Sequence, residues 1–279
     1  MVQAAHDADL VKIFVDRVPS DCIKLETRML KQFSLTSCTV VPDSDMPLTM
    51  DGTMSVVASA GARFLHGRLE KTEPMVIGIG SGRTMSEVVR MLPRIKRQKA
   101  EFVSATGDFA TLSAANPFEV IHALLDKTHG KGFAFTAPLV VDEPDDRELF
   151  LRQKSVQRSF AMLRSAAFIM IGIGHLGPGS FFQQFGLLND EEQADLARAN
   201  VTTDLAGNLV DGEGNFIDTG IARRMLGMER ELLRSRDVIA VCAGMEKWKA
   251  ARAALRTGCL NGFVTSRRVA ERILDEDAV

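Results

Sequence analysis

The sequence predicts an α/β fold with a doubly wound, mostly parallel sheet. First, short apolar runs alternate with amphipathic segments along most of the chain, as they do where β–α units repeat. Second, Met75–Ile79 is apolar at almost every position, which is typical of a parallel strand covered on both faces. Third, turns rich in glycine follow several of the apolar runs, and ligand sites of such folds form at the carboxyl ends of strands.

Eight segments have the length and apolar character of strands. In chain order they are Val11–Val15, Thr39–Val41, Met75–Ile79, Phe102–Ala105, Phe133–Val141, Phe168–Ile173, Val238–Ala243 and Leu260–Thr265. The stretch Val201–Phe216 departs from the alternation, because turn-rich sequences flank Leu209-Val210 on both sides. We expect a hairpin or meander there.

Helices are expected between the strands. Leu25, Met29 and Phe33 recur at four-residue spacing and form one apolar stripe. Asn116-Pro117 is a strong helix start, with Asn as N-cap and Pro in the first turn. The other helices are expected at Asp51–Glu70, Arg83–Leu92, Asp145–Ser165, Asp190–Ala199, Glu246–Arg256 and Arg267–Asp275.

Composition restricts the class of protein. The 279 residues are 46% hydrophobic and 25% charged, with a net charge of −2, which argues against a dedicated nucleic-acid-binding domain. The four cysteines are far apart and form no CxxC motif, so no metal site or disulfide framework is predicted. Neither a membrane span nor a signal peptide is evident. We therefore expect a cytoplasmic protein without a membrane partner, metal or cofactor.

The most informative motif is the loop that follows Met75–Ile79. It contains Gly80, Ser81, Gly82, Arg83 and Thr84, and a helix is expected to begin directly after the glycines. Glycine lets backbone N–H groups approach an anion, and the helix N-terminus adds unsatisfied donors. The hydroxyls and the arginine favour a phosphate cradle over a tight turn without a ligand. The loop is not a Walker A motif, because no Gly-Lys-Ser/Thr follows at the required spacing.

A second glycine motif, Gly172–Gly179, matches GxGxxG after a strand. Pro178 and Gly179 would disrupt the helix that a dinucleotide site needs, and no acidic residue ends a second strand about 20 residues later. We interpret the motif as a flexible loop at the end of a central strand. His175 would then face a ligand or form a hydrogen bond within the loop.

Three further residues have both a functional and a structural interpretation. Lys247 is expected in the first turn of a helix, where a cation is unfavourable unless an anion lies nearby; it could equally be a solvated helix lysine like Lys249. Asp218 could accept hydrogen bonds from ligand hydroxyls or cap a turn, and the same alternatives apply to Asp108. No Ser-His-Asp arrangement, metal-ligand pair or carboxylate pair is evident, so no catalytic residue is predicted.

Taken together, these loops resemble the sugar-binding effector domain of SorC/DeoR-type bacterial transcriptional regulators. The resemblance runs from Leu10 almost to the C-terminus. Its markers, in order, are Leu25-Glu26, Phe33–Leu35, Ile77–Thr84, Gly172–Gly174, Asp218–Gly220, Ala243–Lys247 and Ala253–Leu255. Their order and spacing together make the match specific.

The resemblance implies a Rossmann-like domain, similar to the sugar-phosphate isomerase and glucosamine-6-phosphate deaminase group. In the family this domain binds a phosphorylated sugar and mediates oligomerisation, so we expect a phosphorylated sugar or polyol effector and a homodimer or homotetramer. The resemblance places the phosphate on Gly80–Thr84 with Lys247, and the sugar beside Asp218 and Asn116. Asp108 and His175 complete the expected sugar-side set. Ser81 departs from the family, which commonly has tryptophan or glycine there.

The resemblance also implies a domain organisation. Residues 1–20 would be a residual linker and first strand, and residues 21–279 the effector domain. The family's helix-turn-helix is missing from this chain, so operator DNA would be bound only through a domain that lies outside it. We expect a sensor and not an enzyme. The alternative is a sugar-phosphate isomerase or deaminase, whose Asp-Gly-Ala-Asp-type motif is not matched by Asp211–Asn215.

Overall fold

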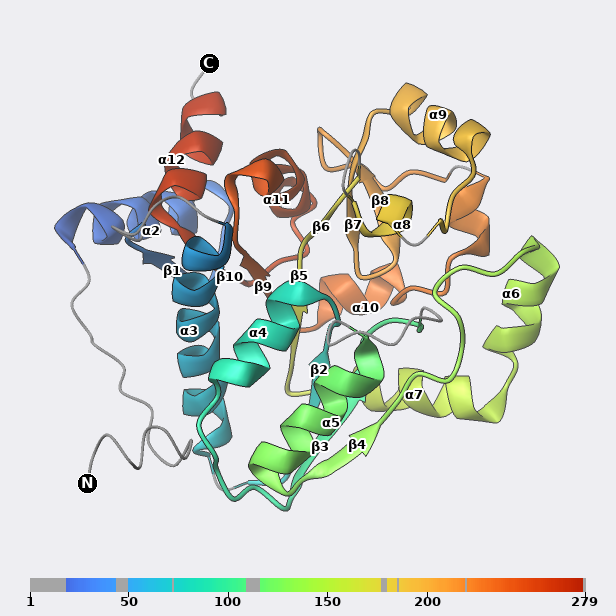
Figure 1. The fold of residues 1–279 in the computed structure, drawn as a ribbon, viewed down its shortest axis with the longest axis horizontal. Helices are drawn as coiled ribbons and strands as arrows, with labels where there is room; N and C mark the ends of the chain where they lie inside the picture. Colours follow the sequence, from blue (N-terminus) through green and yellow to red (C-terminus); the bar gives the residue numbers. More distant parts are fainter. Residues whose placement is uncertain are drawn as a thin grey trace.

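A seven-stranded parallel sheet forms the centre of the molecule (Figure 1). The computed structural model describes residues 19–43, 50–71, 73–108, 116–176, 180–184, 186–218 and 220–277, and only the backbone of Met50 and Asp51. The strands are β1 (Ser37–Val41), β2 (Met75–Ile79), β3 (Ala100–Ser104), β4 (Lys131–Phe133), β5 (Phe168–Gly172), β9 (Val238–Cys242) and β10 (Gly262–Ser266). The predicted doubly wound α/β class is confirmed.

The strand order β1-β10-β9-β5-β2-β3-β4 contains one reversal of winding. From β2 the chain moves outward through β3 to β4. It then returns to the other side of β2 with β5 and continues in the opposite direction. The connections that leave β2 and β5 therefore diverge, and in sheets of this kind a crevice opens between such strands at their carboxyl ends.

Helices cover both faces of the sheet and bury one apolar cluster on each. The first face carries α3 (Met50–Leu69), α4 (Arg83–Met91) and α5 (Pro117–Thr128). The second carries α2 (Ser20–Gln32), α7 (Lys154–Arg164), α10 (Arg230–Ser235), α11 (Trp248–Arg256) and α12 (Arg267–Glu276). Within the described ranges, no helix is long and apolar enough to cross a membrane.

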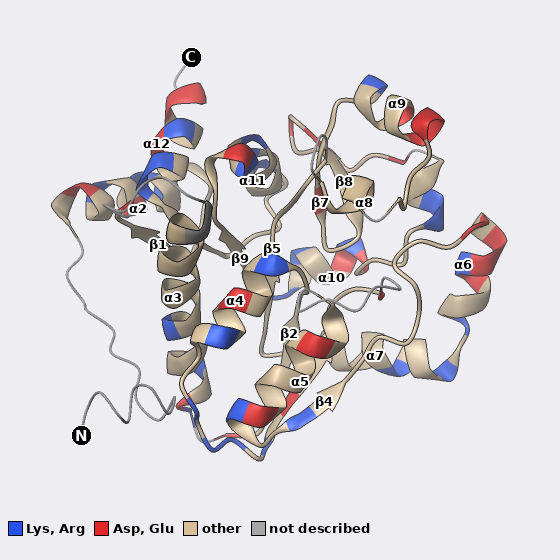
Figure 2. Ribbon diagram, viewed as in Figure 1, with Lys and Arg blue, Asp and Glu red and all other residues tan. Residues whose placement is uncertain are grey.

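Local capping explains where several helices begin. The Asn116 side chain accepts a hydrogen bond from the Phe118 backbone N–H, with Pro117 in the first turn, as predicted. At α9 (Asp190–Arg198), Asn189 and Glu192 form a reciprocal capping box. This helix has acidic residues in its first turn and Arg198 in its last (Figure 2). Both charges have the sign that the helix dipole favours.

A second, three-stranded sheet stands beside the carboxyl end of β5. It consists of β6 (Gly174–His175), β7 (Val201–Leu205) and β8 (Asn208–Asp211), all antiparallel. Ala206 and Gly207 connect β7 to β8 with φ angles of +49° and +81°, as a two-residue hairpin of the type I′ kind requires. This confirms the predicted hairpin. The apolar cluster beneath it also includes α8 (Phe181–Gln184), α9 and the 3₁₀ helix η1 (Ile221–Arg224).

Two predicted elements differ from the structure. The strand expected at Phe133–Val141 ends at Phe133, because the chain then leaves the sheet for a proline-containing stretch with isolated bridges at Pro138 and Val140. The helix expected at Asp145–Ser165 is divided into α6 (Pro144–Leu151) and α7. The extended Gln153 separates them, so that α7 packs on the sheet while α6 lies against η1. The strand expected at Val11–Val15 lies outside the described residues.

The β7–β8 hairpin depends on a close contact between two glycines. A Cβ atom on Gly207 would lie 2.2 Å from the Gly227 Cα, and the positive φ adds strain. We expect Gly207→Ala to lower the free energy of unfolding by at least about 2 kcal/mol. By contrast, Gly67→Ala in α3, where nothing lies within 4 Å of the new Cβ, should raise it by up to about 1 kcal/mol. Urea unfolding of both variants measures these changes; equal effects would contradict the contact.

Candidate functional site

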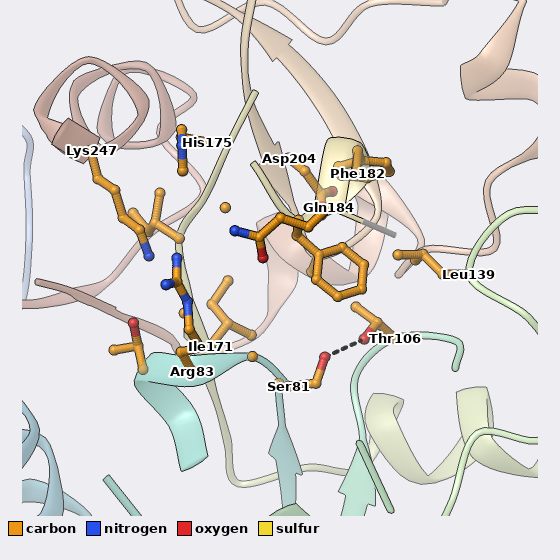
Figure 3. A pocket seen from close by; sticks show the side chains of 18 residues that line it. Ser81, Arg83, Thr106, Leu139, Ile171, His175, Phe182, Gln184, Asp204 and Lys247 are labelled. Atoms are coloured by element: carbon orange, nitrogen blue, oxygen red, sulfur yellow. Dashed lines mark hydrogen bonds between the residues drawn. The ribbon is translucent and has the colours of Figure 1, made fainter. Parts of the chain in front are cut away.

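A pocket of about 370 Å³ opens at the carboxyl ends of β2 and β5, where the winding of the sheet reverses (Figure 3). Its walls come from seven short segments spread along the chain between Gly80 and Lys247. The lining residues are Gly80, Ser81, Gly82, Arg83, Thr84, Thr106, Leu139, Ile171, Gly172, Ile173, Gly174, His175, Phe181, Phe182, Gln184, Asp204, Ala206 and Lys247. The pocket thus brings together the predicted loop at 80–84, His175 and Lys247.

The glycine loop that connects β2 to α4 packs closely against β5. The Gly80 N–H donates to the Met170 carbonyl at 2.8 Å, and a Cβ on Gly80 would lie only 3.1 Å from the Ile171 Cα. Gly82 has φ +97° and is the N-cap of α4, where no side chain caps the helix. The first N–H groups of α4 are therefore left without side-chain acceptors beside the pocket.

Thr84 and Arg83 follow these glycines and offer further donors. The Thr84 side chain is 3% exposed, and its Oγ1 atom has no hydrogen-bond partner. A buried hydroxyl without a partner is unfavourable and rare in folded proteins. Arg83 is exposed at the pocket, and its guanidinium forms no hydrogen bond or ion pair with any residue that the structure describes. Both groups are thus available to an anion.

Lys247 enters the pocket from the turn after β9. Gly244 has φ +99° and begins the 3₁₀ helix η2 (Met245–Lys247), which places Lys247 at the N-cap of α11. Lys247 is only 7% exposed, unlike the exposed Lys249. Its ammonium has no hydrogen-bond or ion-pair partner among the described residues. Burial raises the pKa of the nearby Cys242 thiol to about 12, so this thiol does not supply a counter-charge.

Lys247 and Arg83 meet at one side of the pocket (Figure 3). Arg83 is the first residue of α4 and Lys247 is the N-cap of α11. Without an anion the two cations repel one another, whereas an anion between them would pair with both and could accept from the Thr84 hydroxyl. The arrangement therefore favours a ligand with a concentrated negative charge, such as a phosphate. The interpretation of Lys247 as a solvated lysine is excluded by its burial.

Asp204 is a pocket residue that sequence reasoning missed, because its position before the hairpin indicated only a turn. Its Oδ1 atom accepts a hydrogen bond from the Gly207 N–H at 2.7 Å. Burial raises the pKa of the Asp204 carboxyl from 3.8 to about 7, against the opposing effect of backbone donors at Gly207 and Asn208. A carboxyl that lies in a cleft and titrates near neutral pH is a candidate ligand-binding group.

The side of the pocket opposite Lys247 is apolar. Phe182 and Leu139 lie there and are nearly fully buried (Figure 3). Gln184 projects between this wall and the cations, and the Ser81 and Thr106 hydroxyls lie 3.5 Å apart below it (Figure 3). Apart from Ser81, these residues follow no recognisable motif. Only the folding of separate segments onto one another brings them together.

Three predicted sugar-side residues lie elsewhere. Asp218 is not among the lining residues; its side chain is 72% exposed and accepts a hydrogen bond from Arg230 at 2.7 Å. The Asp108 carboxylate accepts from the Asn116 side chain at 2.8 Å, and neither residue lines the pocket. Asp204 is the acidic side chain among the described lining residues, and the Asn116 side chain caps α5.

The second glycine motif does not form a dinucleotide loop. Gly174 and His175 form β6, which pairs with β7, instead of beginning a helix as the dinucleotide fingerprint requires. Gly172 and Gly174 lie where the chain passes from β5 of the large sheet to β6 of the small one. Among the described residues, no group of three or more His, Cys, Asp and Glu side chains could hold a metal ion.

Comparison with known proteins identifies similar chains. A family model described as "Putative sugar-binding domain" matches residues 17–275. The erythritol catabolism regulatory protein EryD of Brucella abortus (strain 2308) is 29% identical over 269 residues, which are 95% of this chain and 83% of EryD.

Solved structures agree with the fold. A sugar-binding domain of a transcriptional repressor from Vibrio fischeri has a TM-score of 0.83 at 25% identity, covering 92% of this chain and 100% of that one. The full-length sorbitol operon regulator SorC from Klebsiella pneumoniae has a TM-score of 0.83 at 23% identity, covering 98% of this chain and 87% of that one. The Rossmann-like architecture expected from the resemblance is therefore confirmed.

The raised pKa of Asp204 predicts a pH-dependent stability. The folded protein retains this proton between pH 3.8 and about 7, whereas the unfolded chain releases it, so the carboxyl destabilises the fold progressively as the pH rises through this window. Asp204→Asn removes the charge and keeps the shape. Relative to the wild type, we expect this variant to have a higher free energy of unfolding at pH 8.5 than at pH 5. The difference between the two pH values should be about 1 kcal/mol or more, or roughly 2 to 4 °C in Tm.

Thermal unfolding of the ligand-free protein at the two pH values measures this gain. Asp218→Asn is the matched control, because it removes an exposed carboxyl with an arginine partner, and its effect should differ little between the two pH values. A gain for Asp204→Asn that is the same at both pH values would show that Asp204 is not the titrating group.

Proposed function

This chain belongs to the sugar-binding domain family found in SorC/DeoR-type transcriptional regulators, and from this we propose that it senses a phosphorylated sugar or polyol. The family model matches almost the whole chain, and the relatives reported above are named as regulators. The names EryD and sorbitol operon regulator refer to polyols, which supports a polyol or sugar as the carbon skeleton of the effector.

The observation that supports a phosphate is the uncompensated positive charge in the pocket. Lys247 is buried without a partner among the described residues, Arg83 lies beside it, and the Thr84 hydroxyl is unsatisfied. We infer that the phosphate accepts from the N–H groups at the start of α4, from Thr84 and from both cations. Hydrogen bonds between charged partners of this kind contribute about 1.5 to 3 kcal/mol each.

The carbon skeleton would lie between the cations and the apolar wall. Asp204 and Gln184 face this space, and both can accept hydrogen bonds from ligand hydroxyls. His175 is a further candidate on the same side of the pocket as Lys247 (Figure 3). Asp218, Asp108 and Asn116 are not in this proposed contact set, because they lie outside the pocket lining.

We further propose that the effector changes the arrangement of subunits in a homodimer or homotetramer. A ligand can shift such an equilibrium only by its different affinity for the two states. Operator DNA would be contacted by a helix-turn-helix domain outside this chain, and the ordered effector domain would transmit the change to it. Comparing the sedimentation of the protein with and without effector tests this step.

A thermal-shift panel of phosphorylated sugars and polyols, each beside its unphosphorylated parent, tests the sensor function. A ligand at one hundred times its Kd should add about 2.7 kcal/mol, a rise in Tm of very roughly 5 to 10 °C. Stabilisation by a phosphorylated compound but not by its parent supports the proposal. The ligand should then be recovered chemically unchanged, because conversion would favour the alternative function of a sugar-phosphate isomerase or deaminase.

Lys247→Met tests the phosphate contact directly. Methionine keeps most of the length and the apolar stem of the side chain and removes the charge that faces the pocket, so the ligand-free protein should be about as stable as the wild type. Effector affinity should fall about tenfold or more, because a charge-assisted contact is lost. Calorimetric titration with the best ligand from the panel measures this loss.

Lys249→Met is the matched control, since Lys249 lies two residues away on the exposed side of α11. It should leave the affinity within about twofold, as expected for a remote surface charge. Equal affinities for the Lys247 and Lys249 variants would show that Lys247 does not contact the ligand.

A further inference from the structure

The pocket has two chemically different ends, and the difference restricts the kind of phosphorylated ligand. Figure 3 shows Lys247 and Arg83 at one side and Phe182 and Leu139 at the other, with Gln184 between them and Asp204 above Gln184 in this view. We propose that the effector carries a single phosphate and that its other end is uncharged, so that sugar and polyol bisphosphates are rejected. This inference rests on the proposed function, because it specifies the ligand class of the same pocket.

The first argument concerns where positive charge is available. Of the described lining residues, the permanently cationic ones are Arg83 and Lys247, and both lie at the end that contains the α4 N-terminus. His175, the remaining lining residue that can carry positive charge, also lies on that side (Figure 3). One phosphate placed there satisfies these groups together with the Thr84 hydroxyl. A second phosphate on the same skeleton would have to lie toward the other end.

The second argument concerns what that other end offers. Phe182 and Leu139 are 3% and 5% exposed and present only carbon to the ligand. A phosphate dianion against these two side chains would lose part of its hydration without gaining a donor from either of them, which is unfavourable. The nearby hydroxyls of Ser81 and Thr106 lie within hydrogen-bond reach of each other. These hydroxyls are neutral, so they bring no positive charge to balance a dianion.

The third argument is direct repulsion by Asp204. Its carboxyl lines the pocket above Gln184 in the view of Figure 3 and is held in place by the Gly207 N–H. Because its pKa is raised to about 7, it is largely ionised at pH 8. A second phosphate near the apolar end would then meet a like charge in a partly desolvated space, where such repulsion costs a few kcal/mol at an effective dielectric constant of about 20. Asp204 therefore accepts hydroxyl protons and repels phosphate.

The test uses matched triplets of one carbon skeleton at pH 8, with the full chain. Each triplet contains the unphosphorylated compound, its monophosphate and its bisphosphate, for four-, five- and six-carbon sugars and polyols. Fructose, fructose 6-phosphate and fructose 1,6-bisphosphate are the ketohexose set. For a skeleton whose monophosphate binds more tightly than its parent, we expect the bisphosphate to bind about tenfold or more weakly than the monophosphate.

The outcomes separate this inference from the proposed function. A bisphosphate that binds as tightly as its monophosphate, or more tightly, overturns the single-phosphate inference and leaves phosphate sensing intact. If no phosphorylated member of any triplet binds more tightly than its parent, phosphate sensing fails and the single-phosphate inference fails with it.

Two variants test the electrostatic origin of the discrimination. Asp204→Asn should lower the ratio of bisphosphate to monophosphate Kd by about threefold or more, because it removes the like charge. Asp218→Asn removes an exposed carboxyl that lies outside the pocket lining and should leave this ratio unchanged. A ratio that is the same in the wild type and in Asp204→Asn would show that Asp204 has no part in the discrimination.

Discussion

The reversal of winding between β2 and β5 is the constraint on which the rest of the site depends. Because the chain leaves these adjacent strands toward opposite sides, no connection covers their carboxyl ends, and the loop at 80–84 faces the strand that leads into β6. Gly80 has no room for a side chain beside Ile171, so the same packing that joins the two strands also exposes the backbone of the loop. The crevice and the anion cradle therefore have one cause.

The sequence predicted the parts of this site that depend on local rules. The glycine loop, the N-cap at Asn116 and the β7–β8 hairpin each follow from a few neighbouring residues, and each has the expected structure. Burial is what distinguishes Lys247 from Lys249, and burial depends on how α11 packs, which spacing alone left undecided.

The remaining pocket residues could not be predicted, because long-range packing places them. Asp204, Phe182 and Leu139 belong to segments that approach the central sheet only through the small sheet and its apolar cluster. The position of Asp218 also depends on long-range packing. Its turn matched a marker of the family, yet it pairs with Arg230 outside the pocket lining. A carboxylate at a turn can cap, pair or bind a ligand, and only the fold decides among these roles.

The pocket is built from two sheets, and this is the feature that makes it suitable for a sensor. Lys247, Arg83 and Thr84 belong to the central sheet and its helices, whereas Asp204 and Gln184 belong to the small sheet and its adjoining helix. Without ligand, one side contains a cation that has no partner among the described residues, and the other contains a carboxyl whose pKa is raised by burial. A ligand that joins a phosphate to hydroxyls satisfies both sides at once. Under the proposed function, the binding energy of such a ligand would favour one relative placement of the two sheets, and a regulator could transmit that change to neighbouring subunits.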